Sequence, residues 1–404
     1  MSPEIRNAGR REWAAVLALS LGAFALVAAE FMPVSLLTPI AVDLQVTEGQ
    51  AGRAIAVSGA FALVTSLLIA PLAGRLDRKW LLLGLTLVMV ASGTLAALAS
   101  TYPVFMIGRA LIGVAIGGFW SMSAATAMRL VPAHQVPRAL ALVNGGNALA
   151  VVLAAPLGSY FGAIVGWRGA FLSLVPLALV AFVWKAITLP PMPATAVRPA
   201  WNVLALLRRP TVTWGMVAVS LFFMGQFALY TYVRPYLETV AHVEVGTLSM
   251  LLLLLGVAGV VGTLVIEPFI RRGMYTTLAL LPLLMAGIAI ALALTGNRLL
   301  MTALLLGCWG LFATAAPVAW WTWLARTLPH DSESAGGLMV AVVQLAIASG
   351  ATLGGLLFDS AGYRITFFAS AGLLIACMVA AALTSRAARR EADGMRLQTG
   401  VVTG

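Results

Sequence analysis

The sequence is poor in charged residues and in cysteine. Only 10% of its 404 residues are Asp, Glu, Lys or Arg, and it has two cysteines. Soluble globular domains contain about 25% charged residues, so this composition excludes a soluble enzyme, a disordered chain and a nucleic-acid-binding module. Cys308 and Cys377 lie far apart in apolar runs. Their placement argues against a disulfide framework or a metal site and indicates small buried residues.

The chain is rich in apolar residues instead. Apolar residues make up 61% of the chain, and its mean hydropathy is +0.99. A helix that spans a membrane needs about 20 apolar residues. Runs of that kind occur at 13–38, 50–72, 80–99, 103–128, 138–163, 169–189, 211–233, 246–268, 274–295, 299–324, 335–358 and 364–385. The sequence therefore predicts an all-α membrane protein with twelve transmembrane helices in two six-helix bundles.

A polar stretch with five prolines, 190–210, separates the two sets of six runs. We accordingly expect an N-terminal bundle at 1–189, a linker at 190–210, a C-terminal bundle at 211–385 and a mobile tail at 386–404. The first apolar run is too long for the core of a signal peptide, so we expect it to be retained as the first span.

The formal net charge of +11 is distributed unevenly between the two sides of the predicted spans. Nineteen basic residues lie on the side of the N-terminus: Arg6, Arg10, Arg11, Arg75, Arg78, Lys79, Arg129, Arg138, Lys185, Arg198, Arg208, Arg209, Arg271, Arg272, Arg326, Arg386, Arg389, Arg390 and Arg396. Five lie on the other side: Arg53, Arg168, Arg234, Arg298 and Arg364. Cytoplasmic loops carry the excess of Lys and Arg, so both termini are predicted in the cytoplasm of a cell whose inner (plasma) membrane holds the chain.

The two halves repeat each other weakly. Gly166-Trp167-Arg168 recurs as Gly362-Tyr363-Arg364 at an offset of 196, and the Arg129 to Pro132 segment recurs at Arg326 to Pro329 at an offset of 197. Each pair occupies the same place in its half. A parallel repeat of two six-helix halves is typical of major facilitator transporters.

Several motifs resemble those of the major facilitator superfamily. The segment Gly74-Arg-Leu-Asp77-Arg78-Lys79 resembles its loop signature, although the Gly–Asp spacing is one residue short and Trp80 replaces a second glycine. The run from Arg109 through Gly113 to Gly118 resembles the fourth-span motif of proton-coupled members, and Ala155-Pro156-Leu157-Gly158 resembles the fifth-span motif of antiporters. This resemblance implies the major facilitator fold and the drug–proton antiporter branch.

Longer strings are similar to the bacterial purine ribonucleoside efflux pumps. They are Glu30-Phe-Met-Pro-Val-Ser-Leu-Leu-Thr-Pro39, Gly117-Gly-Phe-Trp-Ser-Met-Ser123, Met128-Arg-Leu-Val-Pro132 and Gly225-Gln-Phe-Ala-Leu-Tyr-Thr-Tyr-Val-Arg-Pro235. The resemblance implies export of nucleosides such as inosine and guanosine by proton antiport. Related sugar and drug exporters share many of these strings, so a drug or sugar efflux antiporter is the alternative.

Two ionisable residues lie well inside predicted spans. Glu30 is the only acid there and Arg109 the only base. An ionised acid at mid-span costs about 2.5–3.5 kcal/mol, and burial disfavours its charge, so it can take up a proton at accessible pH. Glu30 is our candidate for the proton-coupling carboxylate, although helix ends or an arginine could instead satisfy it structurally. Arg109 could pair with Glu30, assist proton transfer or hold backbone carbonyls.

Polar and aromatic residues inside other spans are candidates for binding the substrate. Gln226, Tyr230 and Arg234 follow at i, i+4 and i+8, which predicts one polar stripe that faces a cavity. Amides suit ribose hydroxyls and base edges, and aromatic faces suit a purine ring. The predicted substrate-binding residues are Phe119, Trp120, Asn144, Asn147, Gln226, Phe227, Tyr230, Trp309, Trp320 and Gln344. Helix packing and hydrogen bonds between helices explain each of these residues as an alternative.

Asp77 and Arg78 lie at the expected cytoplasmic ends of two spans, where we predict a charge clasp that stabilises one facing state. An ordinary positively charged loop is the alternative. We expect no cofactor, no metal and no enzyme activity, because no HExxH-type motif is present. A channel and a proton symporter are further alternatives, and buried single charges with paired halves favour alternating access over a channel. The expected partners are a small-molecule substrate, protons and the lipid bilayer, with no nucleic acid, and the chain is expected to be a monomer.

Overall fold

The computed structural model describes residues 8–73, 76–193, 204–295, 298–328 and 332–400. Within these ranges every regular element is a helix. The chain divides into two compact units: Met1–Arg198 with Val243–Leu253, and Pro199–His242 with Leu254–Gly404.

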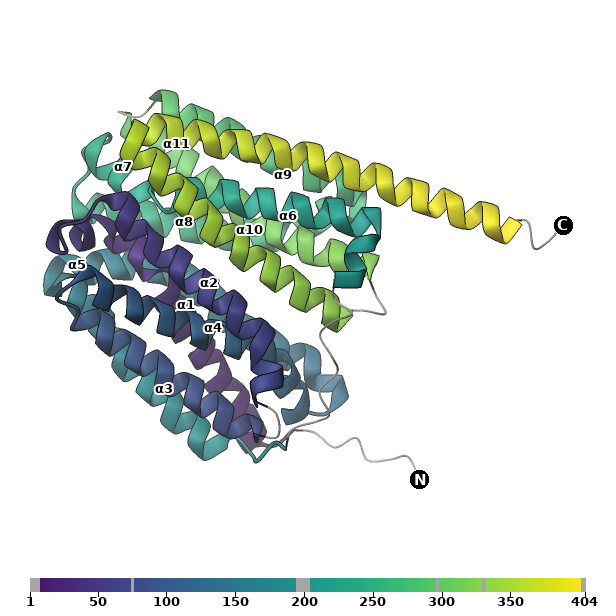
Figure 1. The fold of residues 1–404 in the computed structure, drawn as a ribbon, viewed down its shortest axis with the longest axis horizontal. Coiled ribbons are helices and arrows are strands. Elements are labelled where there is room, and N and C mark those ends of the chain that lie inside the picture. The colour runs from purple at the N-terminus through teal and green to yellow at the C-terminus, as the bar shows by residue number, and fades with distance from the viewer. Residues whose placement is uncertain (1–7, 74–75, 194–203, 296–297, 329–331, 401–404) are drawn as a thin grey trace. The chain divides into compact units, whose positions relative to one another are not determined.

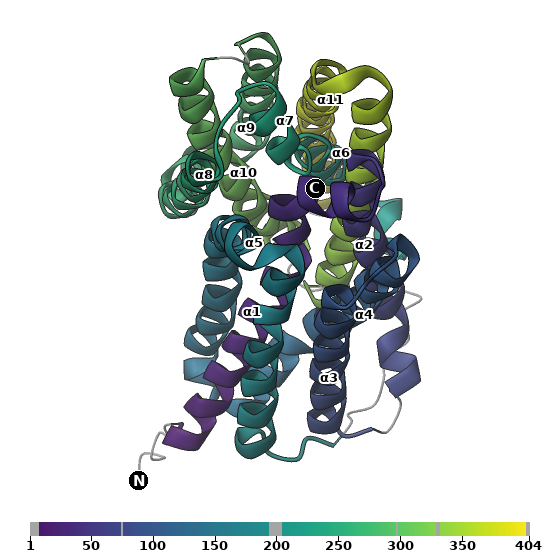
Figure 2. The ribbon, with the colours of Figure 1, turned by 90° about the vertical axis from the view of Figure 1, so that its left-hand side faces the viewer.

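The helices before the linker are α1 (Arg10–Asp43), α2 (Glu48–Ala73), α3 (Arg78–Ala97), α4 (Tyr102–Leu130), the short η1 (Ala133–Gln135) and α5 (Val136–Thr188). Those after it are the short η3 (Leu204–Arg208), α6 (Pro210–Tyr230), α7 (Val233–Thr239), α8 (Val245–Val265), α9 (Glu267–Thr295), α10 (Leu299–Thr327) and α11 (Ser332–Gly400). In the first unit α1, α3, α4 and α5 run alongside one another (Figure 2).

The predicted number of spans is recovered once two helix breaks are counted. Ten of the described helices are long and apolar enough to cross a membrane. Two of them, α5 and α11, contain a glycine in the left-handed region, Gly166 at φ 74° and Gly362 at φ 78°. Side chains with a Cβ rarely adopt that conformation, so each glycine ends one span and lets the next begin. Twelve spans result, as the apolar runs predict.

Gly166 and Gly362 both belong to the sequence repeat. Close contacts between helices also recur in the two halves at nearly the same offset. Gly113 of α4 lies against the Ser58 carbonyl of α2, and Gly310 of α10 lies against the Leu255 carbonyl of α8, an offset of 197. A side chain at either glycine would overlap that carbonyl. The small residues therefore let corresponding helix pairs approach closely in both halves.

Further contacts within each unit show which residues of α1 and α6 correspond. Gly158 of α5 lies beside Met32 of α1, and Gly354 of α11 lies beside Ala228 of α6. Both members of the second pair follow their counterparts at an offset of 196. Corresponding residues of α1 and α6 can therefore be identified by that offset.

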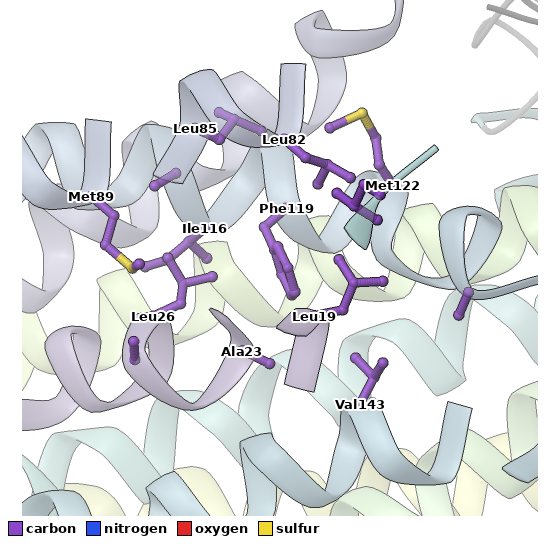
Figure 3. Packing of buried hydrophobic residues seen from close by; sticks show 14 of the residues in the cluster. Leu19, Ala23, Leu26, Leu82, Leu85, Met89, Ile116, Phe119, Met122 and Val143 are labelled. Atoms are coloured by element: carbon purple, nitrogen blue, oxygen red, sulfur yellow. The ribbon is translucent and has the colours of Figure 1, made fainter. Parts of the chain in front are cut away.

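The core of the first unit is an apolar cluster contributed mainly by four helices, with Ala62 added by α2 (Figure 3). It joins α1, α3, α4 and α5 through Leu19, Ala23, Leu26, Leu82, Leu85, Met89, Ile116, Phe119, Met122 and Val143.

Apolar side chains remain exposed along α8, at Met250, Leu254, Val257, Val261 and Leu264, spaced by three or four residues. That spacing forms one helix face, and a lipid-facing helix exposes such an apolar face.

The region beyond the last predicted span differs from the expectation. We expected a mobile tail at 386–404, whereas α11 continues as a helix to Gly400 (Figure 1). Glu391 holds this part of α11 to the start of α6. Its carboxylate accepts hydrogen bonds from the Thr211 backbone N–H at 3.0 Å and the Arg209 guanidinium at 3.2 Å.

Candidate functional site

The middle of α1 carries a buried acid beside a break in the helix hydrogen bonding. Glu30 is only 4% exposed. Pro33 lies three residues later inside the same helix. Because proline has no backbone N–H, the Ala29 carbonyl loses the helical hydrogen bond that residue 33 would otherwise donate. The sequence thus creates a buried acceptor next to the buried acid.

Arg109 of α4 supplies the missing donor. Its guanidinium donates to the carbonyls of Ala29 at 2.7 Å and Glu30 at 2.8 Å. On α2 it donates to the Ala54 carbonyl and to the Ser58 hydroxyl, each at 3.3 Å. In this structure Arg109 therefore holds backbone carbonyls of both α1 and α2.

This arrangement fixes the backbone that carries Glu30. Arg109 is 1% exposed and joins α1, α2 and α4 through one planar group. Gly113, one turn further along α4, keeps α4 close enough to α2 for the guanidinium to reach both helices. Buried polar groups need partners, so moving α1 away from α4 would leave Arg109 and the Ala29 carbonyl without theirs.

The other predicted substrate-binding residues of the first unit lie in different environments. Phe119 is buried, and its ring packs edge-on against Trp120 at 5.4 Å between centroids. Trp120 is half-buried and packs against apolar residues of α1 and α5. Asn144 is exposed and donates to the Leu140 carbonyl of its own helix at 2.9 Å, whereas Asn147 is half-buried.

In the second unit, four of the predicted residues carry buried polar atoms without a partner. These atoms are the side-chain oxygens of Gln226 and Gln344 and the indole N–H groups of Trp309 and Trp320. No hydrogen bond is made to any of them by the residues that the structure describes. Buried polar groups are rarely left unpaired, so these two acceptors and two donors are unusual features of the second unit.

The two aromatic residues beside Gln226 contact each other. The rings of Phe227 and Tyr230 pack edge-on, 5.9 Å apart. Phe227 is buried and Tyr230 is half-buried.

The predicted polar stripe through Arg234 is wrong. Helix α6 ends at Tyr230, and α7 begins at Val233 after a turn, so Arg234 does not continue the face of Gln226 and Tyr230. Arg234 instead pairs with Glu238 one turn later in α7, at 2.8 Å.

Asp77 serves as a helix cap in this structure. One carboxylate oxygen accepts from the Lys79 backbone N–H at 2.8 Å and the other from the Met192 N–H at 2.8 Å. The Arg78 backbone N–H donates to the Met192 carbonyl at 2.9 Å. The start of α3 is thereby tied to the segment that follows α5. The first residues of the loop signature, Gly74 and Arg75, lie outside the described residues.

Sequence reasoning missed one buried cation, Lys185. It was counted with the loop charges, but it is 2% exposed in the last turn of α5. Its ammonium donates to the Thr86 hydroxyl at 3.1 Å and lies 5.2 Å from the centre of the Phe119 ring. Gly22 of α1 leaves the room that the lysine head occupies. The only signal for its burial was its position just inside the end of an apolar run.

The comparisons with known proteins agree on one family. The family model of the Major Facilitator Superfamily matches residues 19–348. The Transcription regulatory protein OpdE of Pseudomonas aeruginosa is 60% identical over 384 residues, which cover 94% of this chain and 95% of the relative. The Purine ribonucleoside efflux pump NepI of Salmonella typhimurium is 38% identical over 366 residues, which cover 91% of this chain and 92% of the pump.

Solved structures show the same fold at low identity. A bacterial homologue of the human lysosomal transporter Spinster has a TM-score of 0.74 at 14% identity, covering 95% of this chain and 98% of its own. A D-xylose–proton symporter has a TM-score of 0.73 at 15% identity, covering 91% and 96%. The resemblance found in the motifs is confirmed, and the chain is a multi-pass membrane transporter, not an enzyme, that belongs to the Major Facilitator Superfamily.

Proposed function

We propose that this transporter exports purine ribonucleosides such as inosine and guanosine in exchange for protons, as a monomer in the inner membrane with both termini in the cytoplasm. The observation that carries the proposal is Glu30, a buried carboxyl at the centre of α1 whose backbone is held by Arg109. An intramembrane acid is costly, so such residues are rare and typically mark a path for ions or substrate. The similarity to NepI supports the nucleoside as cargo.

The cycle uses Glu30 as the group that carries the proton. With Glu30 ionised, the carrier takes a nucleoside from the cytoplasm and releases it outside when a proton binds to Glu30. The protonated carrier returns, loses the proton to the cytoplasm and starts again. One proton crossing about 100 mV supplies about 2.3 kcal/mol, which supports a gradient of about 50-fold for a neutral solute.

The second unit contributes the polar groups that recognise the cargo. Gln226 and Gln344 offer free acceptors, and Trp309 and Trp320 offer free indole donors. A purine base presents ring nitrogens that accept and N–H groups that donate, and the ribose adds hydroxyls that do both. Phe119, Trp120, Phe227, Tyr230, Asn144 and Asn147 complete the proposed binding set. Asp77 and Arg78 act as the clasp that favours one facing state.

The test is uptake of inosine into inverted vesicles under an imposed pH gradient. Glu30→Gln is expected to abolish gradient-driven accumulation while inosine still raises the thermal unfolding temperature of the purified protein. Glu267→Gln, which removes an exposed carboxylate of α9, is the matched control and should transport normally. Accumulation that survives Glu30→Gln would overturn the coupling role of Glu30.

The same purified protein separates nucleosides from other cargo. The thermal shift is measured with inosine, with a sugar such as xylose and with a lipophilic cation such as tetraphenylphosphonium. A shift with inosine alone supports the nucleoside exporter. A shift with xylose or the cation alone would favour a sugar or drug efflux antiporter instead.

An effect on transcription is a second candidate function, because the OpdE relative is named a regulatory protein. The described helices are long and apolar enough to cross a membrane, so such an effect would arise from the concentration of the exported solute. Transcript profiles of a deletion strain complemented with wild type or Glu30→Gln test this idea. Regulation restored by the transport-inactive variant would show that it does not depend on export.

A further inference from the structure

The C-terminal end of α11 has no counterpart in the first unit. Thr188 donates to the Trp184 carbonyl at 2.7 Å, and Thr384 donates to the Ala380 carbonyl at 2.9 Å, the same contact at an offset of 196. Helix α5 ends at Thr188, whereas α11 continues to Gly400 (Figure 1). The first unit completes its helices without such an extension, so the fold of a six-helix half does not require it.

Glu391 gives this extension a defined position. Its carboxylate accepts from the N–H of Thr211, the second residue of α6, and from the Arg209 side chain. The first N–H groups of a helix have no partner within the helix, so a carboxylate at that end accepts a hydrogen bond that would otherwise be missing. The residues around Glu391 are therefore held beside the start of α6.

Three exposed arginines of the extension lie on the side away from this contact. Arg386, Arg389 and Arg390 precede Glu391 by five, two and one residues. At about 100° per residue, they point between about 100° and 200° away from the direction of Glu391. Arg208, also exposed, precedes α6 by two residues.

These four arginines carry charge that the described carboxylates leave uncompensated. Arg209 is paired with Glu391. No ion pair is formed by Arg208, Arg386, Arg389 or Arg390 with any carboxylate that the structure describes. Arg386, Arg389 and Arg390 thus form an exposed basic stretch of α11, and Arg208 adds positive charge before the start of α6.

We propose that Arg386, Arg389 and Arg390 bind the phosphate groups of anionic phospholipids at the membrane surface. The last predicted span ends at residue 385, so the three arginines of α11 lie within about 8 Å of that end along the helix axis. Guanidinium groups bind phosphate through two parallel hydrogen bonds. Basic residues just outside a span are attracted to anionic lipids, each by a factor of about five.

The experiment counts lipids bound to the full-length protein by native mass spectrometry. The detergent-purified chain is titrated with phosphatidylglycerol or with phosphatidylcholine. Wild type is expected to bind phosphatidylglycerol preferentially. The triple variant Arg386→Gln, Arg389→Gln, Arg390→Gln should lose about 100-fold of that preference, and the matched triple lysine variant should keep most of it.

Two further arms make the result decisive. Glu391→Gln removes a negative charge beside the arginines and frees Arg209 from its ion pair, so the preference should rise by about five-fold. Inorganic phosphate is added at constant ionic strength to distinguish a free-phosphate site from a lipid site. An unchanged preference in the glutamine triple, or displacement of phosphatidylglycerol by inorganic phosphate, would overturn the proposal. Circular dichroism of the glutamine triple verifies that it remains folded.

Discussion

The two units carry different side chains at corresponding positions of corresponding helices. The contacts of Gly158 and Gly354 relate α1 to α6 by 196 residues, so Glu30 corresponds to Gln226. The contacts of Gly113 and Gly310 relate α4 to α10 by 197 residues, so Arg109 corresponds to the buried Leu306.

The backbone contacts change together with these side chains. Ala29 corresponds to Gly225, and both carbonyls accept a hydrogen bond from another helix. The Ala29 carbonyl accepts from Arg109, and the Gly225 carbonyl accepts from the Ser370 hydroxyl at 2.6 Å. Leu229 stands where α1 has Pro33, so α6 has no proline at this point.

The comparison teaches that the helix framework does not need charge at these positions. The second unit packs the same helices around Gln226 and Leu306, and Ala381 stands where the first unit has the buried Lys185. Buried charges are expensive. The second unit has none at these three positions, and its buried Arg234 is paired with Glu238. Four predictions test how far the two units are equivalent.

The largest effect is expected at Arg109. Arg109→Leu introduces the residue of the corresponding position and leaves the Ala29, Glu30 and Ala54 carbonyls without this donor. Removing one partner of a buried polar network costs about 3–5 kcal/mol. Thermal unfolding of the purified protein measures the loss. Leu306→Met is the control and should cost less than about 1.5 kcal/mol. Equal stability of the two variants would mean that Arg109 does not hold α1.

The close helix contacts should respond equally in both units. Gly113→Ala and Gly310→Ala each place a Cβ against a carbonyl oxygen of the neighbouring helix, so the helices must separate. Overpacking of this kind costs about 1–3 kcal/mol. Gly287→Ala is the matched control, because nothing lies near that position, and alanine favours a helix by about 1 kcal/mol. A large loss at only one of the two contacts would break the correspondence between α4 and α10.

The breaks inside α5 and α11 should show a smaller and again matched effect. Gly166→Ala and Gly362→Ala meet no neighbouring atoms, so the cost is left-handed backbone strain alone, about 1–2 kcal/mol. Gly372→Ala, also without close neighbours but at an ordinary helical φ, should not destabilise. Chemical denaturation in detergent measures all three. No loss at Gly166 or Gly362 would show that these positions can adopt another conformation.

Much of the fold follows from the sequence, because apolar runs and Gly166 or Gly362 define the spans directly. One partner of Arg109 could also have been predicted. Pro33 has no N–H, so the carbonyl of Ala29 lacks its helical hydrogen bond and needs another donor. The end of α6 at Tyr230 also had a local signal, because Pro235 has no N–H to donate to the Thr231 carbonyl. The burial of Lys185 depends on Thr86, Phe119 and Gly22 from three other helices, and such tertiary contacts are not visible in a local pattern.

The smallest effect is expected where the units differ at their surfaces. Asp43 accepts from the Arg168 side chain and from the Trp167 indole at 3.2 Å, whereas Arg364 of the second unit lies on the Tyr363 ring at 5.9 Å. Both side chains of the Asp43–Arg168 pair are more than a third exposed, so solvent screens the attraction and such pairs contribute about 0–1 kcal/mol. Asp43→Asn should therefore cost less than about 1 kcal/mol in thermal unfolding, and the cost should shrink in high salt. Arg364→Gln is the comparison in the second unit, where the contact described is with the Tyr363 ring and salt should change little. A loss at Asp43 that persists in high salt would mean that the Trp167 hydrogen bond, rather than the charge pair, holds this end of the first unit.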